Sequence, residues 1–188
     1  MAKHDYPHPR RLPAPRKQEL SAGEQAIWEK IDQTRGGVWG PYTALMHKPE
    51  LARRVAAVGE LLRFDSKLPG RERELAILTA AREGESRFEW AVHEPIAVRE
   101  GLSQETLEIV RGKMETGRLQ DRERLVIELV RSLINLKTIE EPLYREADAA
   151  FSTEELLELV AIAGFYQLLA FVIAGFDVPP PEGAARTF

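Results

Sequence analysis

The stretch GESRFEWAVHEPIAVREG, residues 84–101, contains side chains that could transfer protons. Glu89 and His93 stand four residues apart in it, so on a helix they share one face and can pair. A carboxylate can fix the tautomer of an imidazole, which exchanges protons near neutral pH. The same spacing is typical of a pair that only stabilises its helix, with Glu89 also completing a capping box with Ser86. Spacing alone leaves both interpretations open.

Glu74 is a third candidate for this site. A short loop around Gly84 would fold its segment back against the next one, so that Glu74 lies over the face of Glu89 and His93. Two Glu and one His could form a proton relay or bind a metal, but no His-x-x-x-His pair or repeated Glu-x-x-His motif accompanies them. We therefore expect a relay that uses no metal and no other cofactor.

The composition narrows the chemistry further. The chain has 188 residues, no cysteine and a net charge of -4. Without thiols, disulfides, thiolate metal sites and cysteine nucleophiles are all excluded. The acidic balance gives no sign of a nucleic-acid partner, and 44% apolar with 30% charged residues is ordinary for a soluble globular protein.

Helix signals predict the elements that position these residues. Capping boxes, N-terminal prolines and apolar residues at helical spacing predict helices near 21–37, 48–64, 71–83, 86–101, 103–113, 121–137 and 152–175, and one that starts at Pro142. Pro95 should bend the helix that carries His93. Because β-branched residues fall inside helical patterns and no hairpin signal occurs, we expect an all-α fold of about seven or eight helices.

One segment could span a membrane by its length. Residues 159–176, LVAIAGFYQLLAFVIAGF, have Gln167 as their only strongly polar side chain. An acidic approach, the absence of basic flanks and the rigid VPPPEG exit favour a buried helix instead, with no membrane partner. A helix that is apolar on all sides is difficult to bury in so short a chain, so we also expect a homo-oligomer.

The chain length predicts one domain with short extensions. Residues 1–17 contain four prolines and five Lys or Arg without the apolar core of a secretory signal, which predicts a flexible arm and a cytoplasmic protein. We place the Pro-rich arm at residues 1–19, the single helical domain at 20–183 and a C-terminal tail at 184–188.

Three motifs resemble a known family. R-E-x-x-I-L around Glu74, E-W-x-x-H at 89–93 and A-x-x-x-G-L-S at 97–103 occur in this order within Gly40–Val110. This run resembles the carboxymuconolactone decarboxylase family, within the alkylhydroperoxidase D-like superfamily, and the similarity covers about residues 20–183. The resemblance implies an all-helical fold, assembled as trimers or hexamers with sites near subunit contacts.

The resemblance also maps the site of the superfamily's peroxidases onto this chain. These enzymes use a Glu, a Cys-x-x-Cys pair and a His, which correspond here to Glu74, to Ser86 and Glu89, and to His93. A thiolate attacks the peroxide and a second thiol resolves the product, so Ser and Glu cannot replace them. A peroxidase-like antioxidant protein is therefore an alternative that the absence of cysteine opposes.

The decarboxylase branch needs no cysteine. Loss of CO2 from a carboxylated lactone leaves electron density that must be delocalised and then protonated. His93 held by Glu89 could supply that proton, with Glu74 orienting the imidazole. We expect a lyase or proton-transfer enzyme that acts on a small carboxylated or lactone-type molecule, and a non-catalytic oligomeric binding protein is the remaining alternative.

Four further residues are candidates for substrate contacts. Arg63 and Arg73 could hold substrate carboxylates and are chosen for their charge. Trp90 could line a pocket or fill the core, and Ser86 stands next to the predicted relay.

Overall fold

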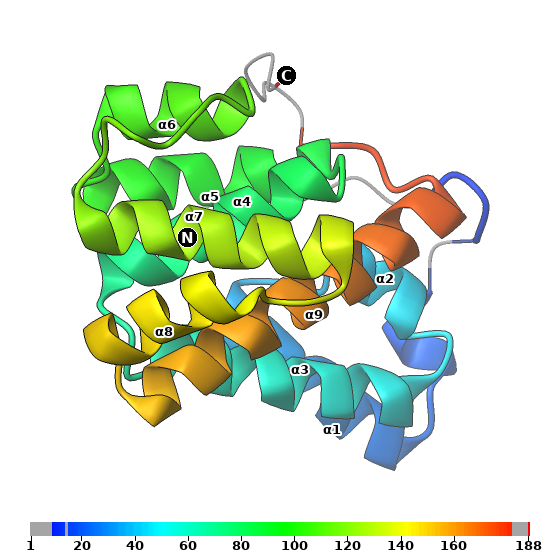
Figure 1. Cartoon of the computed structure of the whole chain (residues 1–188). Coiled ribbons are helices and arrows are strands. Elements are labelled where there is room, and N and C mark those ends of the chain that lie inside the picture. The colour runs from blue at the N-terminus through cyan, green and yellow to red at the C-terminus, as the bar shows by residue number, and fades with distance from the viewer. Residues whose placement is uncertain (1–8, 14, 182–187) are drawn as a thin grey trace.

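The computed structural model describes residues 9–13, 15–181 and 188 (Figure 1). Within these ranges the chain forms nine α-helices, a 3-10 helix and a π-helical stretch and contains no strand, so the predicted all-α class is confirmed. The elements are η1 (Lys17–Glu19), α1 (Ala22–Arg35), α2 (Pro41–Leu45), α3 (Pro49–Phe64), α4 (Gly70–Glu83), α5 (Arg87–Arg99), α6 (Gln104–Arg111), α7 (Asp121–Arg131), η2 (Ser132–Leu136), α8 (Glu141–Ala150) and α9 (Thr153–Phe176).

The structure differs from the expected helices at two places. The sequence analysis missed α2, which has five residues and is too short to show a helical period. This helix begins after Gly40, whose φ of +59° suits glycine, and has Pro41 in its first turn. The helix predicted to reach residue 137 changes at Ser132 from α-helical to π-helical geometry, and Lys137 ends it with a φ of 62°.

α4 is the central helix of the fold. Every residue from Glu74 to Ala81 is buried, and α4 contacts α5, α7 and α9 most extensively. Burial on all sides explains why this segment is almost entirely apolar, since each fully buried leucine contributes about 1.5–3 kcal/mol. Its two polar residues are both hydrogen-bonded: Thr79 donates its hydroxyl hydrogen to the carbonyl of Leu75 at 2.7 Å, and Glu74 pairs with His93. Figure 1 shows α6 at one edge of the molecule and α1 with α3 at the opposite edge, with α7 and α9 between them.

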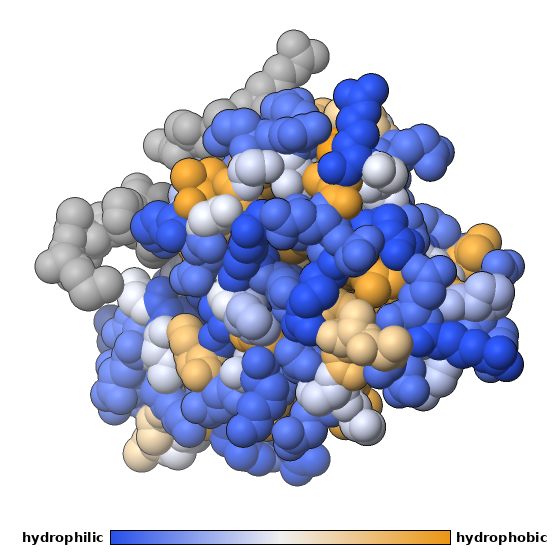
Figure 2. Space-filling view, turned by 60° about the vertical axis from the view of Figure 1, so that its left-hand side comes forward, coloured by the Kyte–Doolittle hydropathy of each residue, from blue (hydrophilic) through white to orange (hydrophobic). Residues whose placement is uncertain are grey.

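α9 is long and apolar enough to cross a membrane by length and composition, and its most apolar window has a mean hydropathy of 2.2. In the fold it packs against α2, α3, α4 and α7. Its outward side includes Leu157 and Phe171, which are 68% and 73% exposed. Figure 2 shows that hydrophobic patches also occur among hydrophilic side chains on one face of the molecule. α9 is thus a core helix that leaves part of its apolar surface uncovered in the single chain.

The N-terminal arm is described in part. The N–H of Arg10 donates to the carbonyl of Asp177 at 3.0 Å, so this part of the arm lies against the end of α9. The residues outside the described ranges are 1–8, 14 and 182–187. They include much of the predicted arm (1–19) and most of the predicted tail (184–188), and the domain boundaries stay a prediction.

Candidate active site

The turn between α4 and α5 brings the predicted relay residues together. Gly84 follows the last residue of α4, and Glu85 adopts a left-handed φ of 52°, which reverses the chain. α5 therefore folds back along α4, and the two helices pack against each other. His93 comes to face Glu74 as a result, which is the placement that the short loop predicted.

Glu89 does not complete the capping box that its spacing suggested. The hydroxyl of Ser86 accepts from the N–H of Glu89 at 3.5 Å, so Ser86 is the N-terminal cap of α5. The N–H of Ser86, however, donates to the carbonyl of Ala81 at 2.8 Å rather than to the Glu89 carboxyl group. The interpretation of Glu89 as a capping side chain is wrong, because the α4–α5 turn already satisfies that donor.

Glu74 holds the ring of His93 in one orientation. Oε2 of Glu74 lies 2.7 Å from Nδ1 of His93, and both side chains are buried. Burial alone would raise the pKa of Glu74, but the hydrogen bond to His93 and the charges of His93, Arg73 and Arg63 outweigh burial and lower this pKa. Glu74 is therefore a carboxylate at neutral pH, and Nδ1 carries the hydrogen that is donated to it. The second nitrogen, Nε2, is left to exchange protons.

Nε2 of His93 has two polar neighbours. The Tyr166 hydroxyl lies 3.2 Å away, and Oε2 of Glu89 lies 3.7 Å away. The second distance is too long for a direct hydrogen bond. The prediction that Glu89 holds His93 is therefore corrected: Glu74 holds the ring, because Nδ1 points across to α4, whereas Glu89 faces the opposite nitrogen from the same helix.

Glu89 is a buried acid beside this nitrogen. Within the described residues, its ion-pair contact is with Nε2 of His93. Burial raises the pKa of Glu89, and the positive charges of His93 and Arg63 offset this only in part. Glu89 thus keeps its proton to a higher pH than an ordinary carboxyl group does. Such an acid is suited to give a proton to a bound molecule.

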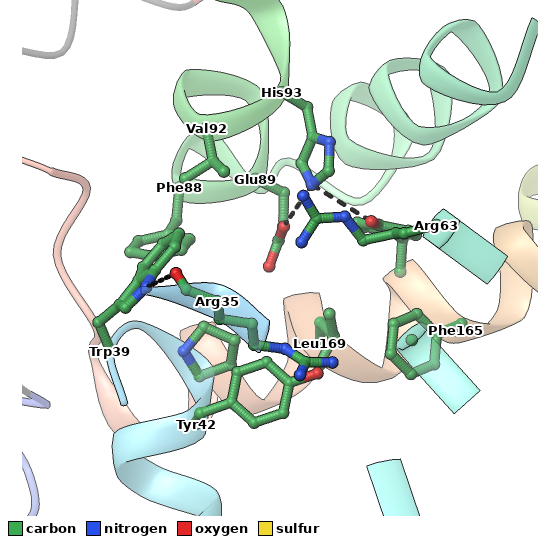
Figure 3. A pocket seen from close by; sticks show the side chains of 13 residues that line it. Arg35, Trp39, Tyr42, Arg63, Phe88, Glu89, Val92, His93, Phe165 and Leu169 are labelled. Atoms are coloured by element: carbon green, nitrogen blue, oxygen red, sulfur yellow. Dashed lines mark hydrogen bonds and ion pairs between the residues drawn. The ribbon is translucent and has the colours of Figure 1, made fainter. Parts of the chain in front are cut away.

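A small cavity lies between α1, α2, α3, α5 and α9 (Figure 3). Its volume is about 40 Å³, which is room for a few water molecules at roughly 10–15 Å³ each. One water could therefore bridge the gap between Glu89 and His93. The residues that line the cavity are Arg35, Trp39, Pro41, Tyr42, Gly59, Arg63, Phe88, Glu89, Val92, His93, Phe165, Tyr166 and Leu169. The polar groups of the relay thus meet a wall that is mainly aromatic and aliphatic.

Two arginines line the cavity in different surroundings. Arg35 forms an ion pair with Glu60 at 3.2 Å and lies 4.5 Å from the centre of the Tyr42 ring. Arg63 lies 5.1 Å from the centre of the Phe64 ring, and in the part of the chain that the structure describes it has no hydrogen bond and no ion pair. Figure 3 shows its guanidinium group directed into the same space as Glu89 and His93. Arg63 is therefore available to an anionic ligand.

Of the four predicted substrate contacts, Arg63 lines the cavity and the other three do not. Nε of Arg73 lies 3.6 Å from Oε1 of Glu74, outside the cavity lining. Trp90 is fully buried in the hydrophobic core. Ser86 caps α5. The placement of Arg73 and Ser86 in the substrate pocket is corrected, because Arg73 lies beside Glu74 on α4 and Ser86 is used as a cap, and of the two roles left open for Trp90 the structure shows core packing.

Sequence reasoning missed Tyr166 and Arg35. Tyr166 stands 73 residues after His93, and a tyrosine within the apolar run of α9 was the one available signal. Nothing marked Arg35, which ends α1 as basic residues commonly end helices. Both residues join the site through packing between distant helices.

Glu74, Glu89 and His93 are not arranged as metal ligands. Across the described ranges, no group of three or more His, Asp or Glu side chains could hold a metal ion. The two carboxyl groups face opposite nitrogens of the His93 ring, so they cannot share one ion with it.

This arrangement of helices has relatives among solved structures. A peroxidase-related protein from Ralstonia eutropha JMP134, described as an alkylhydroperoxidase AhpD core, superposes with a TM-score of 0.76 at 17% identity over 92% of each chain. A peroxidase-related protein from Silicibacter sp. TM1040 has a TM-score of 0.72 at 18% identity over 98% of this chain and 97% of that chain. A protein of unknown function from Agrobacterium tumefaciens has a TM-score of 0.66 at 19% identity over 73% and 94% of the two chains. The chain has the AhpD-like helical fold.

Part of the sequence also matches a known protein family. A profile of the carboxymuconolactone decarboxylase family matches residues 49–132, which span α3 to α7. No curated protein matches the sequence. Residues 49–132 thus match the carboxymuconolactone decarboxylase family, and the resemblance that the three motifs predicted is confirmed for this part of the chain. The matched residues contain Glu74, Glu89 and His93, whereas Arg35 and Tyr166 lie outside them.

Proposed function

We propose that this protein is a lyase-type proton-transfer enzyme, which releases the carboxyl group of a small carboxylated or lactone-type molecule as CO2. The observation that supports this is the position of Glu89, at the cavity and 3.7 Å from Nε2 of a histidine that Glu74 anchors at 2.7 Å. A protonated acid next to a fixed imidazole can both deliver a proton and be reloaded.

The charge of the cavity suits a decarboxylation. The bond between the carboxylate and the adjacent carbon breaks, and its electron pair moves into a conjugated carbonyl group to give CO2 and an enolate. The substrate carries one negative charge before and after this step, so one nearby cation can balance it throughout. Arg63 lines the cavity and is free of ion pairs within the described residues, and we assign it this role.

The relay completes the reaction. The O–H bond of Glu89 breaks, a C–H bond forms on the enolate carbon, and Glu89 becomes a carboxylate. His93 then takes up a proton from solvent at Nε2 and passes it to Glu89, directly or across one water. The net change is one carboxylate and one proton converted to one C–H product and CO2. A positioned acid of this kind contributes about 10²–10⁴-fold to a rate.

A thiol peroxidase is the alternative that the fold neighbours raise, since two of them are described as peroxidase-related. The chain contains no cysteine, so no side chain can form the sulfenic acid and disulfide of that route. The Ser86 hydroxyl is engaged at the start of α5. We therefore favour the lyase over the peroxidase.

Assembly and location belong to the same proposal. We expect a homo-oligomer, a trimer or a hexamer, because Leu157 and Phe171 leave apolar surface on α9 exposed in the single chain. We expect it in the cytoplasm, acting on a small molecule and without a membrane or nucleic acid. A non-catalytic oligomeric binding protein would share this assembly, and turnover separates the two.

The test is CO2 release from a panel of small β-keto acids and carboxylated lactones, with Glu89→Gln as the diagnostic variant. Because glutamine keeps the shape of Glu89 but cannot donate an acidic proton, turnover should fall about 10²-fold or more. Glu115→Gln on the surface is the matched control and should leave turnover unchanged. Turnover that survives Glu89→Gln would refute the relay, and the absence of CO2 release from every compound would favour the binding protein.

A further inference from the structure

We infer that the cavity selects small, flat molecules with a single carboxylate and discriminates against dicarboxylates, with Arg63 as the residue that determines this specificity. The inference rests on the proposed function in one respect, namely that this cavity is the substrate site. It adds the charge and shape of the substrate, which the decarboxylation proposal leaves open.

Arg35 is not available for a substrate. Its Nη1 lies 3.2 Å from Oε1 of Glu60, and its Nη2 donates to the carbonyl of Ala56 at 2.8 Å. The guanidinium group also lies over the Tyr42 ring, and the Arg35 side chain is almost completely buried. Glu60 neutralises this charge, so Arg35 supports the wall of the cavity and adds no net positive charge to it.

Arg63 is the remaining source of positive charge. Lysine is absent from the described cavity lining, and His93 is balanced by the Glu74 carboxylate at 2.7 Å. Arg63 has no ion pair or hydrogen bond among the described residues, and its side chain is partly buried. A carboxylate that enters the cavity can form the bidentate contact with this guanidinium group that arginine favours.

A second carboxylate would find no second free cation in the described lining. Apart from the relay, the two arginines and the Tyr42 hydroxyl, the described lining is aromatic or aliphatic and includes Trp39, Phe88, Val92 and Phe165. The other polar groups near Arg63 are the Tyr42 hydroxyl, which burial keeps neutral so that it balances no charge, and Glu89, which would repel a second anion once it is ionised. An unpaired buried charge is strongly disfavoured, so each additional carboxylate should weaken binding.

The walls also set the shape of the ligand. Trp39 and Phe88 lie with ring centres 5.7 Å apart, and Tyr42 and Phe165 line the same cavity. Flat unsaturated molecules pack well against such rings. With a volume of about 40 Å³, the cavity admits a small group deeply and leaves the rest of a ligand at its mouth.

Isothermal titration calorimetry with four matched probes tests this specificity. We expect benzoate to bind and benzamide, which has no charge, to bind at least about tenfold more weakly. Terephthalate should bind at least about tenfold more weakly than 4-carbamoylbenzoate, which has the same size and one carboxylate fewer. Arg63→Gln should abolish the preference for benzoate over benzamide, while Arg54→Gln, an exposed position on the same helix, should keep it.

A structural effect of Arg63 can be separated from a direct one. Arg63→Lys keeps the positive charge and should retain the preference for a single carboxylate, with thermal unfolding checking that each variant is folded. Equal affinities for terephthalate and 4-carbamoylbenzoate, an Arg63→Gln variant that binds like the wild type, or no binding of any probe would each overturn the inference.

The outcomes also separate this inference from the proposed reaction. Binding of benzoate through Arg63 without CO2 release from any substrate would support the specificity and count against the lyase. Efficient CO2 release from a dicarboxylate would support the lyase and count against the specificity.

Discussion

The imidazole of His93 is bonded through Nδ1 to Glu74, 2.7 Å away, although the two residues stand nineteen positions apart in the chain. Glu89 stands four positions away on the same helix and lies 3.7 Å from the other nitrogen. The ring therefore separates a carboxyl group whose pKa is lowered from one whose pKa burial raises. Two similar substitutions at these positions should have opposite effects on stability.

Glu74→Gln should destabilise the protein by about 1–3 kcal/mol at pH 7, because a charge-assisted hydrogen bond to His93 is lost. The folded-state pKa of Glu74 is lowered from 4.5. Its contribution is therefore fully present above pH 4.5 and is lost as the pH falls through the folded-state value. Urea unfolding of the wild type and the variant at pH 7 and pH 3.5 should show a difference that shrinks on acidification, and Glu115→Gln should show none. A difference that is constant with pH would contradict this.

Glu89→Gln should have the opposite effect and stabilise the folded protein above pH 4.5. Burial raises the folded-state pKa of Glu89 above 4.5, so its contribution is present below pH 4.5 and is lost as the pH rises through the folded-state value. The buried carboxylate of Glu89 is unfavourable at pH 8, whereas glutamine carries no charge. The variant should therefore melt at a higher temperature than the wild type at this pH. The two melting temperatures should converge near pH 4.5. A variant that melts lower at pH 8 would show that the ionised Glu89 is better stabilised than its contacts indicate.

Tyr166→Phe should reveal the third contact of the relay. The hydroxyl lies 3.2 Å from Nε2 of His93, and burial raises the pKa of Tyr166 well above its usual value, so the hydroxyl stays protonated and can donate. Its removal should cost about 0.5–1.5 kcal/mol in urea unfolding, because a buried hydrogen bond is lost while the ring packing is kept. The exposed Tyr144→Phe should change stability by less than about 0.5 kcal/mol. Equal effects at the two positions would mean that the Tyr166 hydroxyl makes no net contribution.

Gly40→Ala should disturb the rim of the cavity. Gly40 has a φ of +59°, and an added Cβ would lie 2.3 Å from Cζ of Phe88, a ring of the cavity wall. Backbone strain and displacement of this ring should together cost about 2 kcal/mol or more and weaken binding of benzoate. Gly23→Ala in α1 meets no atom within 4 Å and should instead stabilise by about 0.5–1 kcal/mol. Thermal unfolding and calorimetry of both variants measure the contrast.

Local sequence was sufficient for most of the helices. The capping box predicted at Ser21 is present, and the helix predicted to begin at Ser152 begins there with a capping box of its own, because a cap depends on residues three positions apart. Glu74 and His93 meet for a similar local reason. The turn at Gly84 is so short that the two consecutive helices pack against each other. The absence of cysteine excluded a thiol-based mechanism without any structural information.

Only the tertiary structure decided which residues of the site contact one another. Spacing predicted that Glu89 and His93 share one face of α5. The orientation of the imidazole depends on the neighbouring α4, which carries Glu74, the hydrogen-bond partner of Nδ1. Tyr166 reaches the ring from α9 and Arg35 reaches the cavity from α1, through contacts between segments far apart in the chain. Periodicity determines which face a residue occupies within its own helix, whereas the partner of that face is determined by packing between helices.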